Sequence, residues 1–307
     1  MMKERERPMM GVGHRLRDDQ QRLPVWLKSS VSPEGHFKQV EKRLRDNHLH
    51  SVCQSARCPN RNECWSLGTA TFLILGNLCT RTCRFCSVPK GQPSGLDRNE
   101  PERVAAAVAA LRLSHVVVTS VTRDDLQDGG AAIFADTIRA IRRTNPGCRV
   151  EVLIPDLGGS EGSLKIVNEA NPDILGHNLE TVPSFYPAVR PQAVYKRSLQ
   201  LLERGKQSGM ITKSGLMVGL GERRDELSSV MRDLRSVGCD IVTIGQYLRP
   251  GRGYFPVKKY YHPDEFAVLR QEAFSLGFRS VVTGPLVRSS YRAGQYNINN
   301  MTGSNHV

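Results

Sequence analysis

The chain of 307 residues is poor in aromatic residues and in long apolar runs. Phe, Trp and Tyr make up 6% of the sequence, and no basic stretch alternates with aromatic residues as a base-stacking surface requires. We therefore expect no nucleic-acid partner. The excess of 43 Lys and Arg over 30 Asp and Glu still favours an acidic partner, such as an acidic protein. No apolar run is long enough to cross a bilayer, so we expect no membrane association.

The N-terminus also lacks the features of a targeting segment. It begins M-M-K-E-R-E-R-P and carries Glu4, Glu6, Asp18 and Asp19 with no apolar core. This pattern fits neither a secretory signal nor a transit peptide, and we expect a cytoplasmic protein. Thiols stay reduced in that compartment, so the eight cysteines are expected to bind metal rather than to form disulfides.

Six of the eight cysteines fall into two short groups. In the second cysteine group, Cys79, Cys83 and Cys86 are spaced as C-T-R-T-C-R-F-C. Three thiolates this close can converge on one metal centre, either zinc or an iron–sulfur cluster. A closed zinc site needs a fourth ligand, whereas a 4Fe-4S cluster held by three cysteines keeps one iron open for another ligand. A partial zinc site remains the alternative from spacing alone.

The first cysteine group precedes the second by fifteen residues. It comprises Cys53, Cys58 and Cys64, with four and then five residues between them. Nearby Pro59, Asn60 and Asn62 predict an irregular loop rather than a helix. Three thiolates on such a loop can wrap a second cluster or a zinc ion.

From residue 71 onward the sequence predicts alternating strands and helices of an α/β fold. The predicted strands are 71–76, 115–120, 149–154, 173–176, 211–218, 240–244 and 279–282, and the helices are 102–113, 131–143, 163–170, 194–208, 222–237 and 263–276. Apolar strands separated by helices pair in parallel. The six strand–helix units predict a partial (βα)6 barrel rather than a full barrel of eight units, with the chemistry at the carboxyl ends of the strands. The second cysteine group follows the first of these strands.

The complete pattern closely resembles the lipoyl synthase family of the radical S-adenosylmethionine (SAM) superfamily. Besides both cysteine groups, the sequence contains R-S-S-Y at 288–291, V-T-S-V-T-R-D-D-L-Q-D-G-G at 118–130, H-N-L-E-T-V at 177–182, G-L-M-V-G-L-G-E at 215–222 and I-G-Q-Y-L at 244–248. The resemblance runs from about residue 24 to about residue 294. Gln54 and Asn77 depart from the acidic residues expected beside ligands, which affects neighbouring hydrogen bonds rather than ligation.

The resemblance implies a reaction, its cofactors and its partners. The family inserts two sulfur atoms at carbons six and eight of an octanoyl chain on a lysine of a lipoyl carrier domain. These carbons are unactivated, so the chemistry requires a radical. The implied cofactors are SAM and two 4Fe-4S clusters, one of which cleaves SAM while the auxiliary one donates sulfur. The implied partners are octanoylated carriers, namely the glycine cleavage H protein and the acyltransferase components of 2-oxoacid dehydrogenases, and an electron donor such as ferredoxin or flavodoxin.

The resemblance also implies roles for individual residues. The second cysteine group holds the SAM cluster, and the first group holds the auxiliary cluster with Ser290 as its fourth ligand. Asn178, Glu180 and Arg190 are the implied SAM contacts. The resulting division is an N-terminal extension (1–50), an auxiliary cluster loop (51–70), a radical SAM partial barrel (71–284) and a C-terminal segment that closes the auxiliary cluster (285–307).

Two other interpretations of the cysteines remain at this stage. A radical SAM methylthiotransferase acting on tRNA or a ribosomal protein also uses two clusters, but its auxiliary cysteines belong to a separate N-terminal domain that we do not find here. A non-catalytic, zinc-stabilised binding protein would be colourless, whereas two 4Fe-4S clusters make a protein brown. An anaerobic absorption spectrum with iron and sulfide counts separates these interpretations.

Overall fold

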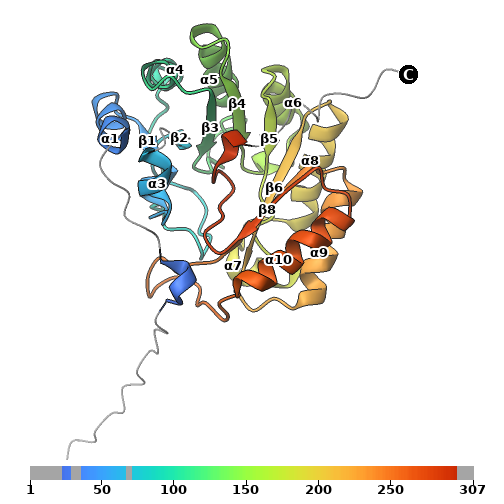
Figure 1. Ribbon diagram of the computed structural model, residues 1–307. Helices are drawn as coiled ribbons and strands as arrows, with labels where there is room; N and C mark the ends of the chain where they lie inside the picture. The colour runs from blue at the N-terminus through green and yellow to red at the C-terminus, as the bar shows by residue number, and fades with distance from the viewer. Residues whose placement is uncertain (1–22, 29–35, 67–70, 296–307) are drawn as a thin grey trace, which may run out of the picture.

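One open sheet of eight strands organises the part of the chain that the structure, a computed structural model, describes: residues 23–28, 36–66 and 71–295 (Figure 1). The strands are β1 (His50–Ser51), β2 (Thr71–Ile74), β3 (His115–Ser120), β4 (Arg149–Leu153), β5 (Ile174–Gly176), β6 (Thr212–Val218), β7 (Ile241–Gln246) and β8 (Ser280–Gly284). They lie in chain order across the sheet. β2 to β8 are parallel, and β1 is antiparallel to β2. Within the described residues β1 and β8 do not pair, so the barrel is not closed.

Six helices connect the parallel strands and cover the outside of the sheet (Figure 1). They are α4 (Glu100–Ala110), α5 (Ala131–Thr144), α6 (Glu161–Glu169), α8 (Tyr195–Gln207), α9 (Arg224–Ser236) and α10 (Pro263–Ser275). α9 illustrates why they pack there, since Leu227, Val230, Met231 and Leu234 recur at helical spacing on one face and are buried. The predicted partial (βα)6 barrel is confirmed.

Most residues of the parallel strands are buried, because helices cover one face and the barrel interior lies on the other. All four residues of β2 are buried, and so are all six of β7. β2 leads directly into the second cysteine group, so a rigid strand fixes where that loop begins. No helix in the described part of the chain has both the length and the apolar character needed to span a bilayer.

The first cysteine group does not lie on the irregular loop that we predicted. The short helices α2 (Val52–Ser55) and α3 (Arg61–Ser66) flank Cys58. α2 forms because the Oγ of Ser51 accepts the N–H of Cys53 at 3.2 Å and caps the helix. Pro59 lies in the connection between the two helices, where a proline prevents either helix from continuing. The predicted irregular loop is therefore found in that connection alone.

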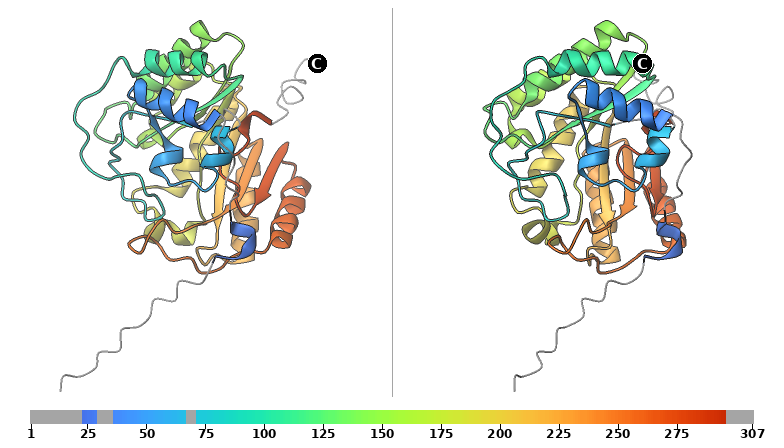
Figure 2. Two further views of the ribbon diagram at one scale, coloured as in Figure 1. Left: turned by 60° about the vertical axis from the view of Figure 1, so that its left-hand side comes forward. Right: turned by 90° about the vertical axis from the view of Figure 1, so that its left-hand side faces the viewer.

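Several smaller elements were also absent from the prediction. They are η1 (Val25–Leu27), η2 (Leu157–Gly159), η3 (Pro183–Phe185), α7 (Tyr186–Val189), η4 (Ala293–Gln295) and the strand β1. The helix α1 (His36–Asp46) lies between η1 and β1 in the chain. η1 lies beside the start of α10, where the indole Nε1 of Trp26 donates to the carbonyl of Tyr261 at 3.1 Å (Figure 2). Parts of the predicted N-terminal extension (1–50), auxiliary cluster loop (51–70) and C-terminal segment (285–307) lie outside the described residues, namely 1–22, 29–35, 67–70 and 296–307.

Residues 285–295, here called the C-terminal segment, cross the open edge of the barrel and contact the first cysteine group. The Nδ2 of Asn60 donates to the carbonyl of Leu286 at 2.6 Å. Glu63 accepts hydrogen bonds from the Tyr291 hydroxyl at 3.0 Å and from Arg292 Nη2 at 2.7 Å. Parts of the chain more than 220 residues apart therefore form one wall of the barrel.

Two interior glycines make room for the C-terminal segment. A Cβ atom on Gly245 of β7 would lie 2.0 Å from the carbonyl oxygen of Val287, and one on Gly215 of β6 would lie 2.7 Å from the Ser289 Oγ. Any larger residue would therefore collide with the segment. The segment approaches the sheet this closely because both positions lack a side chain.

Candidate active site

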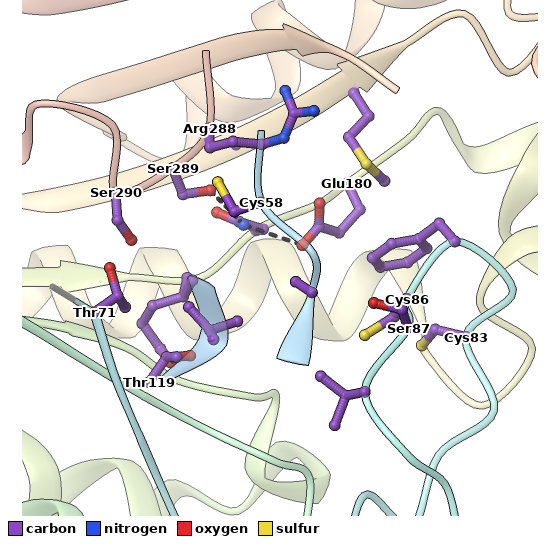
Figure 3. Close-up of a pocket in the computed structure, with 18 of the residues that line it drawn as sticks. Cys58, Thr71, Cys83, Cys86, Ser87, Thr119, Glu180, Arg288, Ser289 and Ser290 are labelled. Carbon is purple, nitrogen blue, oxygen red and sulfur yellow. Dashed lines mark hydrogen bonds between the residues drawn. The ribbon is translucent and has the colours of Figure 1, made fainter. Parts of the chain in front are cut away.

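All predicted site residues line one cavity of about 520 Å³ at the carboxyl ends of the barrel strands. They are Cys53, Cys58, Cys64, Cys79, Cys83, Cys86, Asn178, Glu180, Arg190 and Ser290. Figure 3 shows Cys58, Ser289 and Ser290 on one side of the cavity and Cys83 and Cys86 on the other. The fold thus brings the two cysteine groups to a shared space from opposite sides.

Main-chain hydrogen bonds hold the loop of the second cysteine group. The N–H of Cys79 donates to Pro89 O at 2.9 Å, and the N–H of Gly91 donates to Cys79 O at 3.0 Å. The N–H of Thr122, after β3, points at the Cys79 Sγ at 3.4 Å. The loop is therefore closed on itself and attached to the neighbouring strand, which keeps its thiols at the cavity wall.

Arg81 anchors the same loop to two other strand ends. Its guanidinium binds both carboxylate oxygens of Asp124 at 2.8 Å, and its Nη2 donates to Asp156 Oδ1 at 2.6 Å. Burial raises the pKa of Asp156, but the hydrogen bond and the charge of Arg81, with smaller contributions from His177 and the Gly158 N–H, together leave the pKa below its usual value. Arg81 is 6% exposed. Removing one partner of such a buried pair costs about 3–5 kcal/mol, so Arg81 rigidifies the loop.

The thiols of each group interact electrostatically with one another. Burial, followed by the charges of Cys53 and Cys58, raises the pKa of Cys64 to about 12. Burial, with smaller effects of Cys83 and Cys79, raises the pKa of Cys86 to about 11. Cys64 and Cys86 are therefore neutral thiols in the metal-free chain, and a bound metal centre is needed to stabilise them as thiolates.

The two serines of the C-terminal segment have different surroundings. The Ser289 Oγ accepts a hydrogen bond from Asn178 Nδ2 at 2.6 Å. The Ser290 hydroxyl has no hydrogen-bond partner in the described chain. Arg288, beside them, has its pKa lowered by burial, while the charges of Cys58 and Glu180 act in the opposite direction. The sequence pattern singled out Ser290, and the structure adds Ser289 as a partner of Asn178.

Asn178, Glu180 and Arg190 meet beyond the end of β5. Asn178 Nδ2 also donates to Glu180 Oε1 at 3.0 Å, and Arg190 Nη1 donates to the carbonyls of Asn178 and Leu179 at 2.9 and 2.7 Å. Burial raises the pKa of Glu180 despite the opposing charge of Arg190. The buried Asn178 Oδ1 and Arg190 Nε have no hydrogen-bond partner in the described chain. Polar atoms of this kind are ready to bind a polar ligand.

His177 is already satisfied by the protein. Its Nδ1 lies 2.9 Å from Ile154 O and its Nε2 lies 2.9 Å from the Ser198 Oγ. Burial, helped by the Arg190 charge, lowers the pKa of His177 to about 4, so the ring is neutral near pH 7. Both ring nitrogens form hydrogen bonds within the barrel, which gives this histidine a structural role in the wall of the cavity.

The donor set fits iron–sulfur clusters and a polar cofactor. Among the described residues no three Cys, His, Asp or Glu side chains are arranged around a single metal ion. Each thiolate of a cluster site binds a different iron, so a cluster needs three cysteines around a shared space. Two groups of three cysteines on opposite walls of one cavity provide two such sites. Between them, the unpartnered atoms of Asn178 and Arg190 provide polar contacts.

Comparisons with known proteins agree with this arrangement. The sequence model of the radical SAM superfamily matches residues 73–234, and that of the N-terminal domain of lipoyl synthase matches residues 4–58. The lipoyl synthase of Symbiobacterium thermophilum is 55% identical over 283 residues, which are 92% of this chain and 88% of that protein. The lipoyl synthase of Rubrobacter xylanophilus is 54% identical over 272 residues, or 88% of this chain and 85% of that protein.

Solved structures share the fold at low sequence identity. Methylornithine synthase superposes with a TM-score of 0.53 at 15% identity, covering 80% of this chain and 81% of that one. The [FeFe]-hydrogenase maturase of Carboxydothermus hydrogenoformans superposes with a TM-score of 0.54 at 16% identity, covering 81% and 72%. At this identity the likeness concerns the barrel alone.

Proposed function

This chain belongs to the lipoyl synthase family, and from that premise we propose which of its residues hold the cofactors and the substrate. It is a radical SAM enzyme that inserts two sulfur atoms into an octanoyl chain attached to a carrier protein. The observation that carries the residue assignment is that both cysteine groups and Ser290 line one cavity.

We assign the second cysteine group to the cluster that binds SAM. Its loop follows β2 at the carboxyl end of the barrel, is closed by main-chain hydrogen bonds and is anchored through Arg81. Cys79, Cys83 and Cys86 provide three ligands, which leaves one iron for SAM. When bound, this cluster and SAM supply the radical that removes hydrogen from the octanoyl chain, and the auxiliary cluster supplies sulfur.

We assign the first cysteine group and Ser290 to the auxiliary cluster. The contacts of Asn60 with Leu286 and of Glu63 with Tyr291 bring the two halves of this site together. Ser289 is held by Asn178, which leaves the Ser290 hydroxyl to act as the ligand. An alkoxide is a harder ligand than a thiolate and binds cluster iron more weakly. One weakly held corner fits a cluster that gives up its sulfur.

We assign SAM to the polar region at the end of β5. Asn178 Oδ1 and Arg190 Nε are buried without a partner in the described chain, and SAM carries an amino group and a carboxylate that match an acceptor and a donor. Glu180, whose carboxylate lines the same cavity, offers a further acceptor. Arg190 Nη1 donates hydrogen bonds to main-chain carbonyls, so Arg190 also fixes the shape of this region.

The octanoyl chain is expected between the two cysteine groups. Apolar side chains there include Leu73, Val121, Leu153 and Met217. An extended apolar chain gains contact with them and positions its carbons between radical and sulfur, where geometry selects the carbon that reacts.

The proposed partners are the octanoylated glycine cleavage H protein, the acyltransferase components of 2-oxoacid dehydrogenases and a ferredoxin or flavodoxin. We also propose a cytoplasmic location and the four-part division at residues 50, 70 and 284.

Replacing all three cysteines of the first group by Ala tests the assignment. The barrel does not depend on them, so SAM cleavage should persist, but lipoyl product should disappear because no sulfur is within reach. The assay measures 5′-deoxyadenosine and lipoyl product in one anaerobic reaction with an octanoylated carrier peptide. Cys239→Ala, at a buried cysteine outside the cavity, is the control. Lipoyl product formed in proportion to 5′-deoxyadenosine by the triple variant would show that this group is not the sulfur source.

A further inference from the structure

Two stretches at the second cysteine group carry cations without acidic residues. Residues 79–95 contain three Lys or Arg, and the loop 247–262 between β7 and α10 contains four. Neither stretch contains an Asp or Glu. The two short stretches therefore hold seven of the 43 Lys and Arg residues of the chain without an acidic residue of their own.

The two stretches pack against each other through aromatic residues. The N–H of Phe255 donates to Arg84 O at 2.8 Å, and the Tyr247 hydroxyl donates to Phe255 O at 2.7 Å. The Arg84 guanidinium lies 5.7 Å from the Phe255 ring centre, and Lys90 Nζ lies 5.2 Å from that of Tyr254. These contacts hold the cations in defined positions rather than leaving them free in solvent.

We define the cationic patch as Arg84, Lys90, Arg249 and Arg252. Three of them are exposed and Arg249 is half-buried. None forms an ion pair with a carboxylate in the described chain, although neighbouring cations do: Arg81 pairs with Asp124 and Asp156, and Lys259 pairs with Glu265. The patch therefore presents an uncompensated positive surface, and such a surface attracts an acidic partner and speeds its association.

The patch lies beside the loop that we assign to the SAM cluster, and two of its members, Lys90 and Arg249, also line the cavity. Lys90 Nζ donates to the carbonyl of Cys86 at 2.8 Å, and Arg84 follows Cys83 in the chain. A partner on this surface is thus separated from the ligand cysteines by little more than their own main chain.

We propose that the cationic patch docks an acidic, low-potential one-electron carrier protein of the flavodoxin or ferredoxin type. The inference rests on the assignment of the SAM cluster to Cys79, Cys83 and Cys86. In the complex the carrier loses one electron and the cluster gains it, with no bond made or broken in this chain. Electron-transfer interfaces are small and charge-guided, which suits a patch of four cations. The octanoylated carrier is the competing occupant; it must deliver a lysine arm between the two cysteine groups, whereas an electron donor needs only to lie close to one of them.

Charge reversal at Arg252 tests the proposal in the cluster-loaded enzyme. The Arg252 side chain is exposed and makes no hydrogen bond or ion pair in the described chain, so Arg252→Glu should fold normally. The dissociation constant of purified flavodoxin, measured by calorimetry at low ionic strength, should rise about fivefold, as expected for the loss and reversal of one exposed charge pair. The difference should shrink as salt is added. The matched control is Arg139→Glu on α5, whose side chain is 55% exposed on the outer helical layer, and it should bind flavodoxin like the unmodified enzyme.

Kinetics with two reductants separate docking from catalysis. With limiting reduced flavodoxin, 5′-deoxyadenosine formation by Arg252→Glu should fall about fivefold, but with dithionite it should equal that of the unmodified enzyme. Arg84→Gln, with Arg232→Gln on α9 as its control, provides a second variant and should behave in the same way, because the exposed Arg84 side chain makes no hydrogen bond or ion pair in the described chain. Unchanged flavodoxin affinity in both patch variants would overturn the proposal. A raised KM for octanoylated carrier with dithionite as reductant would instead assign the patch to the carrier. Absence of dithionite-driven SAM cleavage in the unmodified enzyme would refute the cluster assignment itself.

Discussion

Gly245→Ala should dismantle the auxiliary site while leaving the SAM site intact. A Cβ at position 245 would lie 2.0 Å from the Val287 carbonyl oxygen and 2.9 Å from its carbon. Since Cβ contacts below about 3 Å do not persist in packed interiors, one of the two must move by about 1 Å. Gly245 lies in β7, which pairs with β6 and β8, so the sheet resists the movement and the C-terminal segment shifts instead.

The displacement is large relative to the contacts that hold the segment. The Asn60–Leu286 hydrogen bond is 2.6 Å long, and a shift of about 1 Å takes it beyond bonding distance. Overpacking of this kind costs about 1–3 kcal/mol of folding stability. We expect iron to fall from about eight to about four atoms per chain. The reason is that the proposed auxiliary cluster, one of two four-iron clusters, loses the segment that carries its ligand Ser290. SAM cleavage should remain and lipoyl product should be lost.

Iron and sulfide counts, 5′-deoxyadenosine and lipoyl product measure the outcome, and urea denaturation measures the cost in stability. Gly147→Ala is the control, because no atom lies within 4 Å of its added Cβ and its backbone is not left-handed. A Gly245→Ala enzyme with eight irons and unchanged product yield would refute the argument that this glycine admits the segment.

Three further predictions concern individual side chains. Ala at Cys79, Cys83 and Cys86 together should halve the iron and abolish SAM cleavage, and 5′-deoxyadenosine from that variant would contradict the assignment. Ser290→Cys should retain the auxiliary cluster but slow its breakdown, so sulfur insertion falls more than SAM cleavage; a normal product yield would count against a labile serine ligand. Because burial lowers the pKa of His177 to about 4, the unfolded chain binds more protons below pH 6.5 and stability falls as pH drops. Between pH 7.5 and 5.5 the free energy of unfolding should fall by about 1 kcal/mol from this residue, and His177→Asn should remove that part of the slope in urea titrations, whereas an unchanged slope would contradict it.

The barrel could be predicted from the sequence because its strands contain short apolar runs and most of its helices are amphipathic. β3 was predicted at its observed bounds, 115–120, and the other parallel strands to within two residues at each end, whereas β1 was missed. The cysteine spacing and R-S-S-Y pointed to the cavity residues. These signals are local in sequence, and a local pattern is what such reasoning detects.

The missed features depend on contacts between distant residues. Gly215 and Gly245 lie in the motifs at 215–222 and 244–248, but nothing local indicates their role, which is to admit Val287 and Ser289 from the end of the chain. The Arg81 anchor is similar, since its partners Asp124 and Asp156 follow other strands. The signal available in the sequence was Arg81 itself, because a cation in a cysteine loop without acidic residues must find its carboxylate partners elsewhere in the chain. α2 was missed because a four-residue helix capped by Ser51 is too short to show periodicity.

The wall formed by Asn60 and Leu286 also sets an order of events during synthesis. The two residues are 226 positions apart, and a ribosome adding about 5–20 residues per second needs roughly 10 to 45 seconds to travel between them. During that interval the first cysteine group exists without the segment that later covers it, whereas β2, β3 and the second group are made close together in time. The thiols of the first group therefore wait longest for their site to be completed, and the auxiliary site can be filled only after nearly the whole chain has been made.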